Sequence, residues 1–230
     1  MSQSATAGAA DATRLEAFSD AVFGFALTLL VVSLEVPKSF DALVETMSGF
    51  PAFAVCFAVV VWIWYEHRTY FADYGQWDKT TVTLNAVLLF VVLFYVYPLK
   101  FVFTIVIRDL TGLGPAGGAA LQISQLPALM AIYSVGFVVL FGTFALLYRH
   151  AARAGGARAF TALERFDMET NQRAHLLTAA VGVVSIALAL TLPARLAGVS
   201  GWMYGVLGPL HALYGRRRGR QRQGAAGGGG

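Results

Sequence analysis

The chain has 230 residues, of which 57% are hydrophobic and only 13% are charged. A soluble domain carries about 25% charged residues, so this composition excludes an ordinary water-soluble fold and indicates an integral membrane protein. The formal net charge is +4, but the arginines lack the interleaved aromatic residues of a nucleic-acid-binding patch. Membrane orientation explains them better, so the expected surroundings are a lipid bilayer and the chain is not expected to bind nucleic acid.

Six apolar segments follow one another along the chain, and each can cross a bilayer as a helix of roughly 20 residues. They cover residues 17–36, 50–68, 81–107, 127–148, 174–192 and 198–214. Pro98 can kink the third segment, and the last segment is the shortest. Residues 38–48 are expected to be a polar connection, and the charged stretch 149–173 has room for a short amphipathic surface helix. The pattern predicts an all-α polytopic membrane protein with six spans.

The spans predict one membrane domain over residues 14–215, preceded by a leader and followed by a tail. Residues 1–13 are small and polar without the basic residues of a cleavable signal, so we expect a flexible leader and a retained first span. Residues 216–230 combine five arginines with a glycine run, which predicts a disordered basic tail. Cys56 is the single cysteine and lies in an apolar segment, so neither a disulfide nor a metal site is expected.

The distribution of basic residues predicts which side of the membrane the termini occupy. Six spans place both termini on one side, and 13 of the 17 Lys and Arg residues fall on that side. The other four are Lys38, Lys100, Arg108 and Arg195. Because short basic loops are retained in the cytoplasm, we expect both termini to be cytoplasmic and the protein to lie in the plasma membrane.

The first span divides into an apolar stripe and a polar edge when it is drawn as a helix at 100° per residue. The stripe consists of Phe18, Val22, Phe25, Leu29 and Val32, with Thr28 at its border. Asp20 lies on roughly the opposite face, about one turn from the cytoplasmic end. A carboxylate at a helix centre costs about 2.5–3.5 kcal/mol on insertion scales, so Asp20 is expected to face protein or water.

His67 and Arg68, at the cytoplasmic end of the second span, lie at the depth of Asp20 and can reach it. One interpretation is a polar network at a gate or an ion mouth. The other, which we favour, is an interfacial network that fixes the positions of the helices. Asn85 is polar within an apolar segment, where a hydrogen bond between helices is the usual role. The aromatic residues from Trp62 to Trp77 are expected to anchor this end of the second span at the membrane surface.

These residues also form a motif. The first span reads Arg14-x-x-x-Phe18-Ser19-Asp20, then Ala-Val-Phe-Gly-Phe-Ala-Leu-Thr-Leu-Leu-Val-Val, and closes with Glu35-Val36-Pro37. A second span ending in Trp64 and His67 follows, and the third begins with Asn85 among apolar residues. Together these features resemble the prokaryotic branch of the TMEM175 potassium channel family. The resemblance covers residues 14–99, whereas the last three spans match only in number and charge pattern.

The resemblance implies a homotetramer with six helices per subunit and a pore on the symmetry axis, lined by the first helix. The family lacks the Thr-Val-Gly-Tyr-Gly filter of ordinary potassium channels, and no such segment occurs in this chain. Potassium is the implied permeant ion, and neither a cofactor nor enzymatic activity is implied. By position, the pore constriction falls on Phe25, Leu29 and Val32, with the hydroxyl group of Thr28 nearby.

The same resemblance assigns a structural and gating network to Arg14, Phe18, Ser19, Asp20, His67 and Asn85. One departure concerns the constriction, because the family usually has isoleucine or leucine where this chain has Phe25. Four phenylalanine rings can narrow the pore, gate it by dewetting or attract a cation through their faces.

Two alternatives remain open at the level of sequence. The first is a non-transporting scaffold or assembly protein that acts through the basic loop 149–173 and the tail on anionic lipid or a protein partner. The second is a proton-permeable channel, for which Asp20, Glu35 and His67 are the candidate relay groups. Enzymatic chemistry has no support, since the chain contains no Gly-x-Ser-x-Gly elbow, phosphate-binding glycine loop or His-Glu-x-x-His motif.

Overall fold

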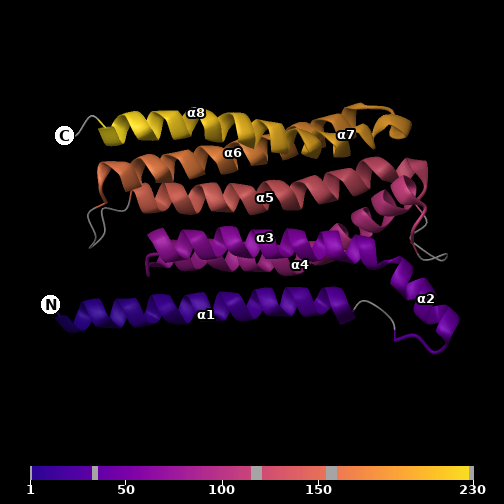
Figure 1. Ribbon diagram of the computed structural model, residues 1–230, viewed down its shortest axis with the longest axis horizontal. Coiled ribbons are helices and arrows are strands. Elements are labelled where there is room, and N and C mark those ends of the chain that lie inside the picture. The colour runs from indigo at the N-terminus through magenta and orange to yellow at the C-terminus, as the bar shows by residue number, and fades with distance from the viewer. Residues whose placement is uncertain (1, 33–35, 115–120, 154–159, 228–230) are drawn as a thin grey trace.

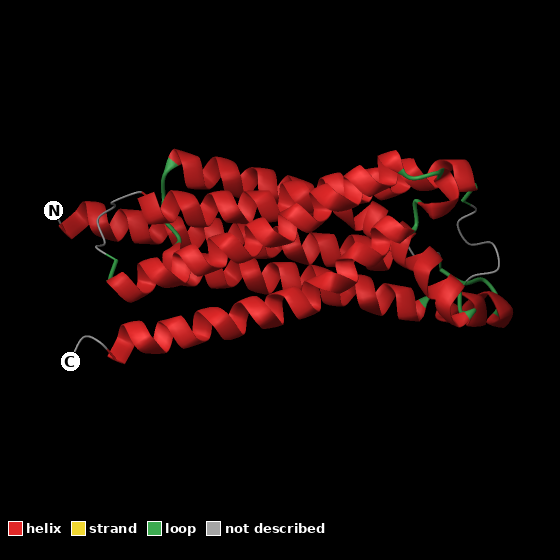
Figure 2. Ribbon diagram, turned by 90° about the horizontal axis from the view of Figure 1, so that it is seen from above, coloured by secondary structure: helices red, strands yellow, loops and turns green. Residues whose placement is uncertain are grey.

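The computed structural model describes residues 2–32, 36–114, 121–153 and 160–227, with side chains described only between residues 13 and 222. Within these ranges the chain is all-α and has no strand. Six long helices run side by side along one axis (Figures 1 and 2). They are α1 (Ser2–Val32), α3 (Phe50–Tyr74), α4 (Lys79–Thr111), α5 (Leu126–Arg153), α6 (Ala162–Thr191) and α8 (Leu207–Gly227).

Shorter helical pieces connect the long helices at the end opposite the termini. They are α2 (Phe40–Ser48), α7 (Val199–Trp202) and three 3-10 turns, η1 (Ile123–Gln125), η2 (Ala194–Leu196) and η3 (Met203–Val206). The described part of the chain begins and ends at the same end of the bundle (Figure 1). An even number of passes along the axis accounts for this arrangement.

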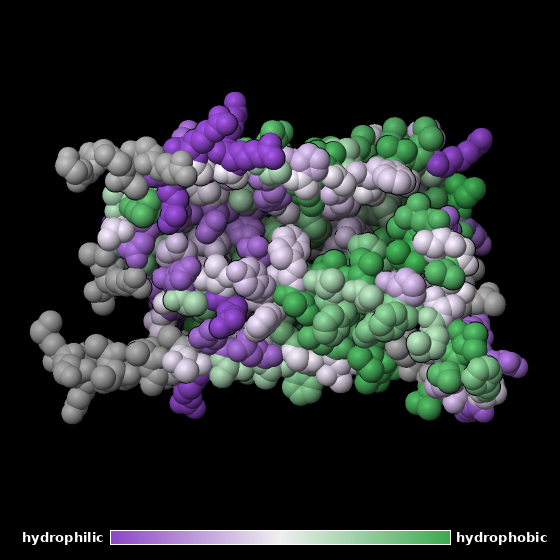
Figure 3. All heavy atoms as spheres, in the orientation of Figure 1, coloured by the Kyte–Doolittle hydropathy of each residue, from purple (hydrophilic) through white to green (hydrophobic). Residues whose placement is uncertain are grey.

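Five segments are long and apolar enough to cross a membrane, which confirms the first five predicted spans. They are Thr13–Val32, Phe50–Tyr74, Lys79–Thr111, Ile123–Arg153 and Ala162–Thr191. The predicted span 198–214 is not among them, because it is divided between α7, η3 and the start of α8. Figure 3 shows hydrophilic side chains gathered at the end that holds the termini and hydrophobic side chains over the middle and the other end.

Local sequence signals explain where several helices begin and end. Asp78 caps α4 by accepting a hydrogen bond from the Thr81 backbone N–H at 2.8 Å, and Thr161 forms a capping box with Glu164 at the start of α6. Gly112 ends α4 with φ = 71°, a left-handed conformation that glycine adopts without strain. Pro98 lies inside α4 without ending it.

The long helices form two groups that meet where α4 packs against α5. One group contains α1, α3 and α4, and the other contains α5, α6 and α8. Small residues allow close approach at these contacts. A Cβ atom added to Gly136 of α5 would lie 2.5 Å from the ring of Tyr95 on α4, and one added to Gly182 of α6 would lie 2.7 Å from Val138 of α5. The spacing between α4, α5 and α6 therefore depends on glycine.

The structure shows helix in three places where the sequence suggested none. The expected polar connection 38–48 contains α2, which begins at the N-cap Ser39. The expected flexible leader and basic tail continue α1 and α8 as helix, from Ser2 and up to Gly227. The charged stretch 149–173 was expected to hold a short surface helix. Instead, α5 ends in it at Arg153 and α6 begins in it at Ala162, so residues 162–173 are the first turns of a spanning helix.

The tail is helical because its side chains bond to α6.

Candidate functional site

Helix α1 has one face buried within the subunit and one face left open. The buried face consists of Ser19, Val22, Phe23, Ala26 and Leu30. On the open face, Phe18, Phe25 and Val32 are 61%, 67% and 70% exposed. These three residues are seven positions apart, which is close to two turns of an α-helix. Large apolar side chains exposed along one helix face indicate that another subunit or the lipid bilayer covers this face.

The open face is narrower than the apolar stripe predicted from the sequence. Val22 turns into the subunit and is buried, and Leu29 is half-buried. Thr28 is exposed, and its hydroxyl group donates a hydrogen bond to the Gly24 carbonyl oxygen at 2.8 Å. Of the predicted constriction residues, the open face therefore presents Phe25, Thr28 and Val32 fully and Leu29 in part.

A buried polar network links α1, α3 and α4 behind this face. The Asn85 amide donates to the Ser19 hydroxyl oxygen at 2.9 Å, and its Oδ1 lies 2.8 Å from His67 Nε2. The Ser19 hydroxyl group in turn donates to the Leu15 carbonyl oxygen at 2.8 Å. All three polar side chains are buried. The network confirms that Asn85 makes the hydrogen bond between helices expected of it, and it connects three spans through one amide group.

The hydrogen bonds of Asn85 also assign the tautomer of His67. Because the amide nitrogen of Asn85 already donates to Ser19, its Oδ1 is the atom that faces His67, and a carbonyl oxygen only accepts. Nε2 of His67 therefore carries the proton, and Nδ1 is left as a buried nitrogen with no hydrogen-bond partner. Phe23 and Phe71 lie against the ring, with centroid distances of 5.3 Å and 4.5 Å. The His67 ring is thus held through Nε2 and enclosed by aromatic rings.

Asp20 has a different partner from the one that the sequence suggested. Its Oδ1 accepts a hydrogen bond from Trp64 Nε1 on α3 at 2.8 Å, whereas His67 is bonded to Asn85. The Arg68 guanidinium lies 5.8 Å from the centre of the Trp64 ring. In the sequence, Trp64 belongs to the membrane-anchoring aromatic residues and to the motif of the resemblance, but neither pattern predicts the contact with Asp20. Asp20 and Trp64 form a second link between α1 and α3.

The remaining predicted network residues lie outside these contacts. Arg14 is exposed on the first turns of the span, and Phe18 is exposed on the open face. Glu35, a candidate proton-relay group, lies outside the described residues. Among the side chains that the structure describes, no three His, Cys, Asp or Glu residues gather as metal ligands.

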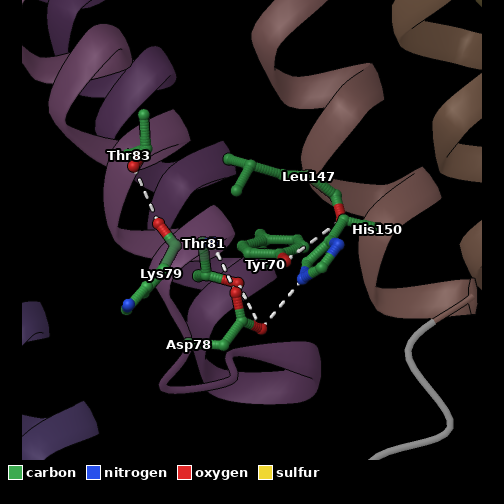
Figure 4. Close-up of polar contacts among 7 residues, drawn as sticks. All are labelled: Tyr70, Asp78, Lys79, Thr81, Thr83, Leu147 and His150. Carbon is green, nitrogen blue, oxygen red and sulfur yellow. Dashed lines mark hydrogen bonds and ion pairs between the residues drawn. The ribbon is translucent and has the colours of Figure 1, made fainter.

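A further polar contact ties the start of α4 to the end of α5 (Figure 4). Oδ2 of Asp78 lies 2.8 Å from Nε2 of His150, and the Tyr70 hydroxyl group donates to the Leu147 carbonyl oxygen at 3.2 Å. Burial opposes the ionised form of Asp78, but the hydrogen bonds from Thr81 and His150 outweigh it and lower the pKa of Asp78. The helix that carries Asn85 is therefore fixed to the second group of helices at this end.

The fold and the site together define a polytopic α-helical membrane protein whose first span is held by buried hydrogen bonds and leaves one apolar face uncovered. A family model described as endosomal/lysosomal potassium channel TMEM175 matches residues 14–95. A potassium channel of Marivirga tractuosa is 36% identical over 218 residues, covering 89% of this chain and 86% of the relative. A potassium channel of Streptomyces collinus is 29% identical over 148 residues, 62% of this chain and 65% of the relative.

Solved structures agree with these sequence comparisons. The crystal structure of a variant of the potassium channel MtTMEM175, in complex with a nanobody–MBP fusion protein, superposes with a TM-score of 0.78 at 33% identity. The match covers 90% of this chain and 93% of that chain. A TMEM175 homolog from Chamaesiphon minutus gives a TM-score of 0.59 at 24% identity over 91% and 98% of the two chains, which supports the fold alone. The chain belongs to the TMEM175 family of potassium channels, and it is not an enzyme.

Replacing Asn85 by leucine should lower the thermal stability of the protein in detergent. The substitution removes both bonds of the amide: it leaves the buried Nε2–H of His67 without an acceptor, at a cost of about 1–3 kcal/mol, and removes the hydrogen bond that the Ser19 oxygen accepts. The matched control is Thr83→Ala, because Thr83 is exposed and bonds only to Lys79 of its own helix. Thermal unfolding followed by intrinsic fluorescence measures both variants. An Asn85→Leu protein as stable as the wild type would contradict the structural role of this network.

Replacing Asp78 by asparagine should destabilise the protein in a pH-dependent way. Since the folded state lowers the pKa of Asp78, its carboxylate stabilises the fold fully above the ordinary value of 3.8. This contribution is lost as the pH falls through the lower pKa of the folded state. The wild type should therefore melt at a higher temperature than Asp78→Asn at pH 6, with the difference vanishing at low pH. Asp73→Asn, an exposed neighbour, should show no such difference. A gap between wild type and Asp78→Asn that does not shrink at all between pH 6 and pH 2 would refute the assignment.

Proposed function

We propose that the chain forms a potassium-permeable cation channel as a homotetramer, with the open faces of four α1 helices surrounding the pore. The observation that carries the proposal is the exposure of Phe18, Phe25 and Val32 on a membrane span whose opposite side is buried at Phe23, Ala26 and Leu30. A closed ring of identical subunits covers such a face by symmetry. Potassium is proposed as the permeant ion because the proteins to which the chain is similar are potassium channels.

Within this assembly, Phe25, Leu29 and Val32 would constrict the pore at successive levels. Rings of bulky apolar side chains restrict hydrated ions and can gate by dewetting. Phe25 is the most bulky of the three, and the quadrupole of its ring favours cations over anions at close range. The constriction is therefore proposed to act as a gate and as a charge filter.

Thr28 offers the one hydroxyl group on the open face at this level. Its proton is used in the bond to the Gly24 carbonyl oxygen, which leaves the lone pairs of the hydroxyl oxygen free to accept. Four such oxygens, one from each subunit, would present partial negative charge to a cation between the levels of Phe25 and Val32. Thr28 is therefore proposed as the ion-contacting polar residue of the pore.

The buried network is proposed to set the rotation of α1 about its own axis. Asn85 holds Ser19 from one side, and Trp64 holds Asp20 about 100° further around the same helix. Two attachments at adjacent positions prevent rotation, which keeps Phe25 and Val32 directed at the axis. Ser19, Asp20, His67 and Asn85 then act by positioning the pore helix.

The described contacts favour potassium over the alternative of proton permeation. A relay needs groups that both donate and accept protons in sequence. Asp20 is bonded to the Trp64 indole, which only donates, and His67 is bonded to the amide of Asn85. The two titratable groups thus belong to separate networks that end on non-titrating partners.

The membrane orientation is also part of the proposal. We propose that α7, η3 and the start of α8 make the sixth crossing, since they run back along α6 toward the end that holds the termini (Figure 1). Hydrophilic side chains gather at that end in Figure 3, and the arginines of α8 and at the end of α5 are among the residues of these helix ends, which favours a cytoplasmic location in the plasma membrane.

Replacing Phe25 by alanine should raise potassium flux into liposomes severalfold, because four large rings leave the narrowest level of the pore. The matched control is Phe90→Ala, since Phe90 is also exposed, at 69%, but lies on α4. Both variants should keep the assembly mass of four 24.7 kDa subunits. An absence of potassium flux in wild type and Phe25→Ala alike would rule out the proposed channel, and an equal response of Phe90→Ala would rule out Phe25 as its constriction.

Cysteine labelling in intact cells should locate the two ends of the bundle. In a Cys56→Ser background, Lys38→Cys, just before the N-cap of α2, should react with a membrane-impermeant maleimide. Gly219→Cys on α8 should react only after the membrane is permeabilised, because the termini face the cytoplasm. Both positions are exposed in the structure. The reverse labelling pattern would invert the proposed orientation.

A further inference from the structure

The arginines of α8 fall into two sets with different surroundings, and the first set is held by α6. Arg222 makes a bidentate ion pair with Asp167, with its Nε and NH2 groups 2.9 Å and 2.8 Å from the two carboxylate oxygens. Nε of Arg218 donates to the Thr170 hydroxyl oxygen at 2.9 Å. Its guanidinium carbon also lies 4.2 Å from the centre of the Phe166 ring.

Tyr214 extends this attachment by one turn, since its hydroxyl group donates to the Thr170 carbonyl oxygen at 3.2 Å. Tyr214, Arg218 and Arg222 are spaced by four residues and therefore share one face of α8. These contacts explain why the predicted disordered tail is helical. They also fix the rotation of α8 about its axis.

The second set consists of Arg216, Arg217 and Arg220, and all three side chains are exposed. At 100° per residue, Arg216 and Arg220 lie about 160° from Arg218, on the far side of the helix from α6, and Arg217 lies about 100° from Arg218, on the flank next to Arg220. No described residue forms an ion pair with any of the three. The held face of α8 therefore leaves three exposed arginines on the far side and one flank of the helix, with Arg216 and Arg220 directed away from α6.

The position of these three arginines along the helix matches the membrane surface. Tyr214 ends the apolar first part of α8, and Arg216 follows two positions later. At the same end, the apolar part of α6 begins directly after Arg173, and α5 ends with Arg149, His150 and Arg153. Arginine just beyond an apolar span lies at the level of lipid headgroups.

These arginines also face the right direction for lipid. Helices α1 and α8 lie at opposite edges of the bundle (Figure 1). If α1 surrounds the pore, α8 is at the periphery of the assembly, where the bilayer and not a neighbouring subunit lies beside it.

We propose that Arg216, Arg217 and Arg220 form a binding surface for the phosphate groups of anionic lipids in the leaflet on the side of the termini. A guanidinium group matches a phosphate with two parallel N–H bonds. The attachment of Arg218 and Arg222 to α6 arranges the three exposed arginines in advance, so binding orders less of the chain. This surface lies apart from the proposed pore. Its place beside the bilayer rests on the proposed assembly around α1, and the name of the leaflet rests on the proposed orientation.

Native mass spectrometry of the detergent-solubilised full-length protein tests this surface. The protein is titrated with phosphatidylglycerol or phosphatidylcholine, and the ratio of the two apparent affinities is measured. The wild type should prefer phosphatidylglycerol, and Arg216→Gln/Arg220→Gln should reduce the preference at least about fivefold, the factor that corresponds to one interfacial basic side chain. The matched control is Lys38→Gln/Arg195→Gln, which removes two exposed charges at the opposite end and should keep the preference.

Equal preference in the wild type and Arg216→Gln/Arg220→Gln would overturn the proposal, and so would an equal loss in the control, since net charge alone would then explain the binding. The thermal midpoint of Arg216→Gln/Arg220→Gln without added lipid should match the wild type, because both side chains are exposed. Its potassium flux in phosphatidylcholine vesicles should also be unchanged. A wild type without flux that still prefers phosphatidylglycerol through these arginines would refute the channel and leave the lipid surface intact.

Discussion

The amide group of Asn85 is the constraint on which the arrangement of the first three spans depends. Polar groups in the hydrocarbon core have no water to bond to, so each must find a protein partner. Asn85 provides that partner for Ser19 on α1 and His67 on α3 at once. Because both neighbours are buried, neither can turn away from Asn85 without losing its bond. The face that α1 buries, and therefore the face that it leaves open, follows from this one side chain.

The same logic connects the proposed pore to the rest of the subunit. Asp78 caps the helix that carries Asn85 and also contacts His150 on α5, so the two groups of helices are joined near the end of the pore helix. Gly136 on α5 has no side chain, so the ring of Tyr95 on α4 can pack directly against the backbone of α5. In the second group, Arg218 and Arg222 fix α8 to α6. On the proposed arrangement, the other arginines of α8 contact the lipid, whereas these two hold the helices of the group together.

Much of the fold could be read from the sequence, because membrane spans are long apolar segments that need no partner to be recognised. The first five spans and the role of Asn85 as a bond between helices are confirmed. The sixth segment was harder to recognise as a span, since glycine and Pro209 divide it into short helical pieces. Helix α2 was missed because its nine residues make only about two and a half turns, too few for its apolar residues to stand out from a polar connection. The tail was predicted to be disordered from its composition, which does not reveal that Asp167 neutralises Arg222.

By itself, the sequence determined that the protein spans a membrane, which segments do so, and, through the motif from Arg14 to Asp20, the family to which it belongs. These are properties of single segments, fixed by local composition and spacing. Only the tertiary structure decided that Trp64 bonds to Asp20, that His67 bonds to Asn85, and that Val22 turns inward while Phe25 stays open. Such choices depend on the depth and rotation of separate helices relative to one another, and no pattern within one helix contains that information.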